Sequence, residues 1–201
     1  MNKDKLNNLL VFVSILVIVI SLLNISTTMT GRATDPTAVV NVTVVAVASI
    51  NFSTDFFDFG VGEITLGSSN ATLESNDSSI QGADGNWSYP SGNGSFVLEN
   101  IGNKNATIDL KVGKSAASFI GGTGPSYDYA ITNNDPTSCN GSANITLGAW
   151  ENTQTYDTRI CDVFEYADAR DSLNVSIQLV IPSDSSTGEL TDTFTATATG
   201  V

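Results

Sequence analysis

Near its C-terminus the chain carries two runs in which apolar and polar side chains alternate. Residues 173–181 place leucine, valine or isoleucine at every second position, and residues 190–199 place Leu190, Phe194 and alanines opposite a row of threonines. Side chains of a β-strand point alternately to opposite faces, so each run offers one face to a core and one to water. A polar connection containing proline and glycine, residues 182–189, joins them. The pattern predicts two strands that pair with each other in an antiparallel manner.

The longest uninterrupted strand signal is residues 38–50, AVVNVTVVAVASI. β-Branched side chains lose rotamer freedom in a helix, so their density here favours an extended strand. Residues 96–99 and 108–112 flank a turn-rich stretch and predict a hairpin. Residues 67–95 are mostly polar and predict long surface connections with one short strand around Trp87. Further short strands are expected at residues 56–66, 118–120, 127–131, 145–150 and 159–166.

Short strands separated by polar turns define the expected architecture. No segment beyond the N-terminal one shows a convincing helical period, and about eight or nine short strands are typical of a β-sandwich. Hydrophobic residues make up 41% of the chain, which is enough to form a core. We therefore expect an all-β fold, a single Ig-like or jelly-roll-like antiparallel β-sandwich at residues 34–201, after an N-terminal hydrophobic leader helix.

Residues 1–33 have the features of an export signal. Lys3 and Lys5 precede an apolar run, residues 9–23, and a Gly-Arg-Ala tripeptide ending at Ala33 supplies a small-x-small junction. As a helix the apolar run spans about 22 Å, short of a hydrocarbon core of about 30 Å, which favours a signal peptide cleaved after Ala33. A retained membrane anchor in a tilted or thinned bilayer is the alternative. In both cases we expect the remainder of the chain to be extracellular or at the cell surface.

The chain is acidic, with 21 aspartate and glutamate residues, 8 lysine and arginine residues and a formal net charge of −13. Such a surface repels phosphate backbones, so we expect no nucleic-acid partner. No histidine is present, which excludes His-dependent triads and imidazole acid–base chemistry. No pair of carboxylates stands out by its spacing. The sequence therefore predicts a protein that is not an enzyme and needs no cofactor, with Ca²⁺ as the one candidate ion.

The chain has two cysteines, Cys139 and Cys161. In an exported chain an isolated pair indicates a disulfide. A loop of this length contributes about 3 kcal/mol in the chain-entropy model. Two buried free thiols are the alternative.

Asn-x-Ser/Thr is the most repeated motif of the chain, and none of its middle residues is proline. One such sequon carries little information, but ten beyond the leader indicate an N-glycosylated exterior. The alternative is a composition rich in asparagine, serine and threonine. Asn41 and Asn174 are expected on polar strand faces, from which a glycan would project. The candidate acceptors are Asn41, Asn51, Asn70, Asn76, Asn86, Asn93, Asn105, Asn140, Asn144 and Asn174.

Acidic and amide residues gather in several of the predicted loops. Ca²⁺ binds six to eight oxygen ligands, so two loops meeting at one end of a sandwich would form a site. Solvated turn residues are the alternative, since no loop has the spacing of a recognised calcium motif. Of the two tryptophans, Trp150 is expected in the core and Trp87 at the surface, where it would offer a sugar-stacking face. The weak calcium candidates are Asp55, Asp58, Asp77, Asp84 and Asp135.

Several stretches together carry a family resemblance. They are the leader followed at once by residues 38–50, the tetrapeptide Phe57-Asp58-Phe59-Gly60, the hairpin at residues 96–112, and the closing run from Ile181-Pro182 through Phe194-Thr195-Ala196. In this pattern the chain resembles the TasA/camelysin-like secreted β-sandwich subunits of archaeal and bacterial fibres and pili. The resemblance covers most of the chain after the leader. It does not extend to the peptidase activity described for camelysin-type proteins, because histidine is absent.

The resemblance implies assembly by donor-strand complementation, in which the N-terminal strand of one subunit fills a groove in the next. An unpaired strand with an apolar face is prone to such association. The alternative is that residues 38–50 form the first strand of their own sandwich. The expected donor residues are Val40, Val42, Val44, Ala46, Ala48 and Ile50.

Two functions follow from the sequence. The first is a non-catalytic structural subunit of a pilus, fibre or cell-envelope layer that associates with copies of itself. The second is a membrane-anchored or secreted surface module that binds carbohydrate or Ca²⁺ through its loops. Membrane contact is expected only through the N-terminal segment.

Overall fold

The computed structural model describes residues 11, 13–15, 42–76, 79–90, 94–141 and 144–201. Contacts divide the chain into two units, Met1–Thr43 and Val44–Val201. Among the described residues, no helix has both the length and the apolar character needed to cross a membrane. The predicted leader helix and the junction at Ala33 lie outside the described residues.

The unit Val44–Val201 is mostly β-structure in antiparallel sheets, which confirms the predicted all-β fold class. One short helix interrupts the strands. The elements are β1 (Ile50–Thr54), β2 (Val61–Ile64), β3 (Asn70–Asn76), β4 (Ser79–Ala83), β5 (Gly85–Ser88), β6 (Phe96–Asn100), β7 (Ala106–Val112), α2 (Ala116–Phe119), β8 (Ser126–Asn133), β9 (Cys139–Asn140), β10 (Glu151–Asn152), β11 (Thr158–Phe164), β12 (Ser172–Pro182) and β13 (Phe194–Gly200).

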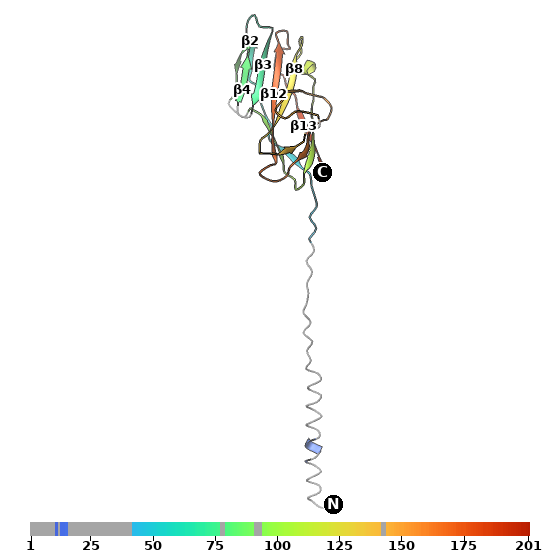
Figure 1. The fold of residues 1–201 in the computed structure, drawn as a ribbon. Coiled ribbons are helices and arrows are strands. Elements are labelled where there is room, and N and C mark those ends of the chain that lie inside the picture. Colours follow the sequence, from blue (N-terminus) through green and yellow to red (C-terminus); the bar gives the residue numbers. More distant parts are fainter. Residues whose placement is uncertain (1–10, 12, 16–41, 77–78, 91–93, 142–143) are drawn as a thin grey trace, which may run out of the picture. The chain divides into compact units, whose positions relative to one another are not determined.

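The larger sheet is organised around β12, which lies between β3 and β8 (Figure 1). One edge of β12 pairs first with β6, along residues 172–175, and then with β3, along residues 178–182. Its other edge pairs with β8 along residues 173–180. β1 extends the sheet beyond β6, β4 extends it beyond β3, and β10 extends it beyond β8. Leu173, Val175, Ile177 and Leu179 face the core, as the alternation predicts.

The hydroxyl of Ser75 lies where β12 changes partner from β3 to β6. Its Oγ accepts a hydrogen bond from the backbone N–H of Ile177 at 2.7 Å, and Ser75 is fully buried. Beside it, the buried hydroxyls of Ser95 and Ser176 share a hydrogen bond of 2.9 Å. Ser75 thus satisfies a backbone N–H that a continuous neighbouring strand would otherwise pair.

The smaller sheet has the order β13-β7-β11-β9 and packs its apolar face on the larger one. Arg159 on β11 lies directly opposite Asp109 on β7, and its Nε donates to Asp109 Oδ1 at 2.8 Å. This bond raises the pKa of the Arg159 guanidinium. β2 and β5 form a separate two-stranded sheet.

Both predicted hairpins are wrong. The runs that form β12 and β13 do not pair with each other, because β12 belongs to the larger sheet and β13 pairs with β7 in the smaller one. In the same way β6 pairs with β1 and β12, whereas β7 pairs with β13 and β11. The turn-rich connections cross from one sheet to the other. Alternation identifies a strand, but it does not identify the partner of that strand.

Several predicted strand positions also change. Residues 42–49 lie in no sheet, and the strand begins only at Ile50. Residues 67–95, predicted as mostly surface connections with one short strand around Trp87, contain β3 and β4 in addition to β5, which includes Trp87. Residues 118–120 end a short helix, whose N-cap Ser115 accepts from the N–H of Ser118. Residues 145–150 are mainly turns, and only Glu151–Asn152 pairs, with β8.

Candidate assembly site

The segment of residues 42–49 is extended and belongs to no sheet of the described chain. Its valines are open to solvent, with exposed fractions of 80% for Val42, 78% for Val44, 70% for Val45 and 51% for Val47. Large apolar side chains at such exposure, gathered on one short segment, mark an interaction surface. We call residues 42–49 the N-terminal segment.

The predicted donor residues divide along this segment. Val42, Val44 and Ala46 are exposed, Ala48 is half-buried against the core, and Ile50 is the first residue of β1. Val40 lies outside the described residues. Within the described residues 42–50, the alternative that this stretch forms the first strand of its own sandwich holds only for Ile50, where β1 begins.

Asn103, in the loop between β6 and β7, fixes the N-terminal segment to the sandwich. Its Oδ1 accepts from the N–H of Val47 at 2.7 Å, and its Nδ2 donates to the carbonyl of Val45 at 3.0 Å. The backbone N–H of Asn103 also donates to the carbonyl of Val47 at 3.0 Å. One residue thus supplies the hydrogen bonds that a neighbouring strand would supply.

The side chain of Asn100, which is 1% exposed, stabilises the loop that carries Asn103. Asn100 Nδ2 donates to the carbonyls of Lys104 at 3.1 Å and Phe164 at 3.2 Å, while its Oδ1 accepts from the N–H of Gly102 at 3.1 Å. A side chain at Gly102 would lie 2.4 Å from the carbonyl oxygen of Val47, so only glycine permits this close approach.

A row of aromatic rings runs between the edge strands β1 and β13. Phe96 of β6 contacts Phe52 of β1, with ring centroids 5.9 Å apart, and Phe194 of β13 at 5.4 Å. Phe57 packs on Phe96 at 5.8 Å, and Tyr127 packs on Phe194 at 5.9 Å. The phenylalanines are only half-buried, so this side of the sandwich is incompletely covered. Burial raises the pKa of Tyr127, as do the charge of Asp192 and a hydrogen bond to it.

The predicted disulfide between Cys139 and Cys161 is present, with a Cα–Cα distance of 5.7 Å. It joins β9 to β11 within the smaller sheet, and both cysteines are buried. The alternative of two free thiols is therefore excluded.

Most of the described sequon asparagines are open to solvent. Asn105 is half-buried, and its Oδ1 accepts from the N–H of Tyr166. The expectation that Asn174 lies on an exposed face is wrong: it is 4% exposed, and its Nδ2 donates to Asn134 Oδ1 at 3.3 Å. Ser172 and Ser176, on the same face of β12, are buried as well, and Asn134 lies against Asn174. Asn41 and Asn93 lie outside the described residues, and the exposed sequon asparagines are Asn51, Asn70, Asn76, Asn86, Asn140 and Asn144.

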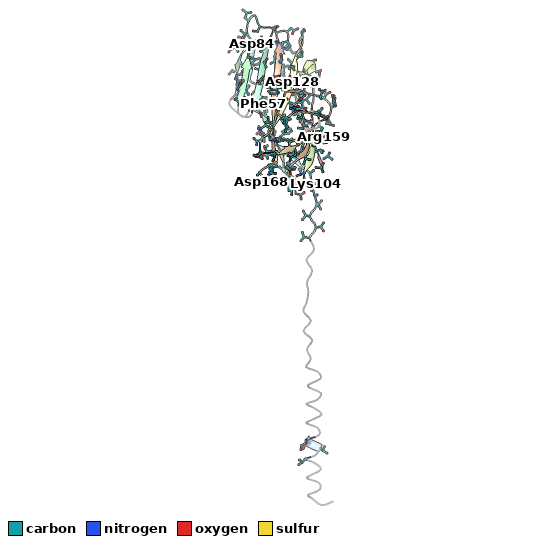
Figure 2. All side chains as sticks on the ribbon, viewed as in Figure 1. Phe57, Asp84, Lys104, Asp128, Arg159 and Asp168 are labelled. Carbon is teal, nitrogen blue, oxygen red and sulfur yellow. A yellow bond between two sulfur atoms is a disulfide. The ribbon has the colours of Figure 1, made fainter. Side chains whose placement is uncertain are left out.

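The calcium candidates are not brought together. No group of three or more acidic, histidine or cysteine side chains in the described part of the chain is arranged to hold a metal ion. Asp58 instead caps its own turn, with its Oδ1 accepting from the N–H of Gly60 at 2.8 Å. Asp84 lies at the opposite end of the sandwich from Asp168 (Figure 2). Asp55 is exposed, and Asp77 lies outside the described residues.

One acidic grouping was not foreseen from the sequence. Partial burial raises the pKa of the Asp171 carboxyl, and the charges of Asp135, Asp168 and Glu99 raise it further. Of these four residues only Asp135 was a calcium candidate. Asp171 follows a turn and precedes β12, so its approach to Asp135 depends on a pairing of strands that no local pattern displays.

The tryptophan expectations are reversed. Trp150 is 38% exposed, whereas Trp87 is half-buried and packs against the core. Trp87 lies over two glycines of the small β2–β5 sheet, since a Cβ on Gly62 would meet its ring at 2.3 Å and one on Gly85 would meet its Nε1 at 2.2 Å. Trp87 therefore offers no open face for a sugar.

Comparison of the chain with protein-family models, with curated proteins and with solved structures finds no match. The resemblance to TasA/camelysin-like subunits remains a prediction from the sequence.

Proposed function

We propose that this protein is a non-catalytic extracellular structural subunit of a pilus, fibre or cell-envelope layer. Copies of the chain would join by β-strand complementation, with residues 38–50 of one copy donated to the next. The observation that carries this proposal is the N-terminal segment, whose valines are exposed and which has no sheet partner among the described residues.

The energetic argument rests on the exposed valines. Burying one valine side chain fully contributes about 1.5–3 kcal/mol, so four of them offer a large gain to any partner that covers them. An extended backbone also offers unpaired N–H and C=O groups to a sheet edge. Donor and acceptor surfaces differ, so the contact is heterologous and leads to an open filament rather than a closed dimer.

Two features of the sandwich support an extracellular location. The disulfide is of the kind that persists in oxidising compartments. Sequon asparagines on several strands and turns are accessible to glycans.

The second candidate is a surface module that binds carbohydrate or Ca²⁺. Its calcium branch has less support, because the acidic side chains of the described residues form no group arranged to hold a metal ion. The exposed ring of Trp150 is the remaining carbohydrate candidate.

The proposal is tested by electron microscopy of the full chain after export, with mass spectrometry of its N-terminus. We expect filaments. Replacing Val42, Val44, Val45 and Val47 together by threonine, which is close in shape but polar, should abolish them. Val61→Thr is the matched control, because Val61 is 81% exposed on β2, away from the segment. Monomers from the unaltered chain, or filaments that survive the fourfold change, would contradict the proposal. Assembly that is lost on calcium chelation would instead favour the binding module.

A further inference from the structure

The strand β13 has an edge that no described strand covers. Gly113 donates its N–H to the carbonyl of Thr193 at 3.0 Å, and Val201 donates to the carbonyl of Asn105 at 2.9 Å. The odd-numbered residues of β13 therefore direct their backbone groups toward β7. Alternation then directs the N–H and C=O groups of the even-numbered residues to the outer edge, where the described chain provides no strand: Phe194, Ala196, Ala198 and Gly200.

Along most of its length β13 lacks the devices that normally protect an edge strand; only at Gly200 do Ala48 and the side chain of Lys104 lie close to it. Proteins protect such edges with charges, prolines, very short strands or covering segments. β13 is seven residues long, and residues 193–201 contain no charge and no proline. In a chain with a net charge of −13, an uncharged edge is a surface on which two copies can approach with little repulsion.

The other strands of the described chain that have a free edge differ from β13. In the two-stranded sheet, β2 contains the acidic Glu63 and β5 carries the exposed sequon Asn86. β1 carries the exposed sequon Asn51, and β9 is two residues long and carries Asn140. β10 is also two residues long and includes the acidic Glu151. β4 begins at Ser79, whose N–H donates to the side chain of the sequon Asn76. No asparagine follows Asn174 in the sequence, so an N-linked glycan on β13 itself is excluded.

The inner side of this edge is apolar and incompletely filled. Phe194, Ala196 and Ala198 are half-buried, and Phe96 links Phe194 to Phe52 of β1 across the sandwich. A strand added beside β13 would place alternate side chains over these rings. Residues 42–49 are suited to that position, since they contain no charge and have small or β-branched apolar side chains at alternate positions.

We propose that the outer edge of β13 is the acceptor for the N-terminal segment of a second copy of this chain, an inference that rests on the proposed function. The incoming segment extends the smaller sheet by one strand. Its even-numbered side chains, from Val42 to Ala46, face the aromatic row, and its odd-numbered side chains lie beside Thr195, Thr197 and Thr199. The acceptor thus gains backbone partners for its outward-facing groups, and the donor gains cover for its valines.

The test is disulfide crosslinking between two variants of the full chain. Each variant gains one new cysteine and keeps Cys139 and Cys161. One variant carries Thr197→Cys. The other carries a new cysteine at Thr43, Val45 or Val47. In the proposed pairing these three positions lie on the same face of the sheet as Thr197, so together they test which of them is opposite it. Directly opposite Cβ atoms in paired strands lie about 4.5–5.5 Å apart, near the spacing that a disulfide requires. The matched control replaces Thr197→Cys by Gln81→Cys, since Gln81 is exposed on the edge strand β4. Each mixture is oxidised after assembly and examined by gel electrophoresis and electron microscopy.

We expect mixed dimers between Thr197→Cys and one of the segment variants, and none with Gln81→Cys. Dimers formed by Thr197→Cys alone would show that β13 pairs with β13 of another copy, which overturns the assignment of the occupant. Filaments that form without any crosslink at Thr197 would overturn the assignment of the edge while leaving the proposed function intact. A chain that never assembles contradicts the proposed function, and the acceptor assignment with it.

Discussion

Asn103 pairs with Val47 as a neighbouring strand would, although neither residue belongs to a strand. The Oδ1 atom of Asn103 accepts from the N–H of Val47 at 2.7 Å, and the N–H of Asn103 donates to the carbonyl of Val47 at 3.0 Å. The N-terminal segment is therefore held extended at one point while its side chains remain exposed. A single side chain determines where the segment leaves the sandwich.

Removing this contact should free the segment without unfolding the sandwich. Asn103→Ala removes the two side-chain bonds, to Val47 and to Val45, each contributing about 0.5–1.5 kcal/mol. Hydrogen exchange at the Val47 amide should accelerate markedly, while the melting temperature changes little. Asn103→Asp keeps the acceptor for Val47 but loses the donor to Val45, so its exchange rate should be intermediate. Equal protection of Val47 in all three proteins would contradict this role for Asn103.

Ser75 should contribute more to stability than its size suggests. Ser75→Ala leaves the buried N–H of Ile177 without a partner at the point where β12 changes neighbours, which costs about 1–3 kcal/mol. Denaturant unfolding measures this loss. Ser53→Ala is the control, because Ser53 is exposed and its hydrogen bond to Val97 is long, at 3.5 Å. If Ser75→Ala and Ser53→Ala lower the free energy of unfolding equally, the hydroxyl of Ser75 does not satisfy the N–H of Ile177.

The disulfide should stabilise the smaller sheet through the unfolded chain. Cys139 and Cys161 are 22 residues apart, and a loop of that size corresponds to about 3 kcal/mol in the chain-entropy model. The double variant Cys139→Ala, Cys161→Ala should therefore melt at a lower temperature than the oxidised protein. Adding a reductant should lower the melting temperature of the unaltered chain but not that of the variant. If the reductant also lowers the melting temperature of the double variant, the loss of stability does not come from this disulfide.

Asp171 and Asp184 should give opposite responses to pH. The pKa of Asp171 is raised by partial burial and by its acidic neighbours, so the folded state holds this proton more tightly than the unfolded state does. Its ionisation therefore costs stability as pH rises from its ordinary pKa of 3.8 through the raised value. Asp171→Asn should stabilise the protein at pH 7, by less than about 1 kcal/mol at this partly exposed site, and the gain should vanish below its ordinary pKa.

The pKa of Asp184 is lowered instead, because its carboxylate accepts hydrogen bonds from the hydroxyl and N–H of Thr123. Its contribution is present above the ordinary pKa of 3.8 and is lost as pH falls through the lowered value. Asp184→Asn should therefore destabilise the protein at pH 7 and have no effect in acid. Thermal melts of both variants from pH 2 to pH 7 measure these changes in stability. If Asp171→Asn and Asp184→Asn shift the melting temperature at pH 7 in the same direction, the two pKa assignments are contradicted.

The sequence predicted strands better than it predicted their neighbours. Residues 127–131 and 159–166 became β8 and β11 with small changes in their ends, because apolar or β-branched side chains mark them locally. β3 was missed because Ser75, a polar residue, occupies an inward position beside Ala71 and Leu73. Its burial depends on Ile177, 102 residues away, and no local pattern reports such a contact.

The candidate assembly site was predicted only in part. The apolar character of residues 38–50 was evident, and so was its lack of charge. Its attachment through Asn103 was not, because that bond joins residues 56 positions apart and uses an asparagine that reads as an ordinary turn residue. The free edge of β13 was missed for a related reason, since the pattern predicted pairing with β12 and the structure pairs β13 with β7.

The position of β12 also determines when the chain can fold. This strand holds β3, β6 and β8 in one sheet, yet it is the last strand but one to be synthesised. Until residues 172–182 are available, three earlier strands lack their common partner, and the bonds that join them span long stretches of chain. Topologies with such long-range pairing fold slowly. Under the proposed extracellular function, this late closure of the larger sheet keeps the chain unfolded while it leaves the cell.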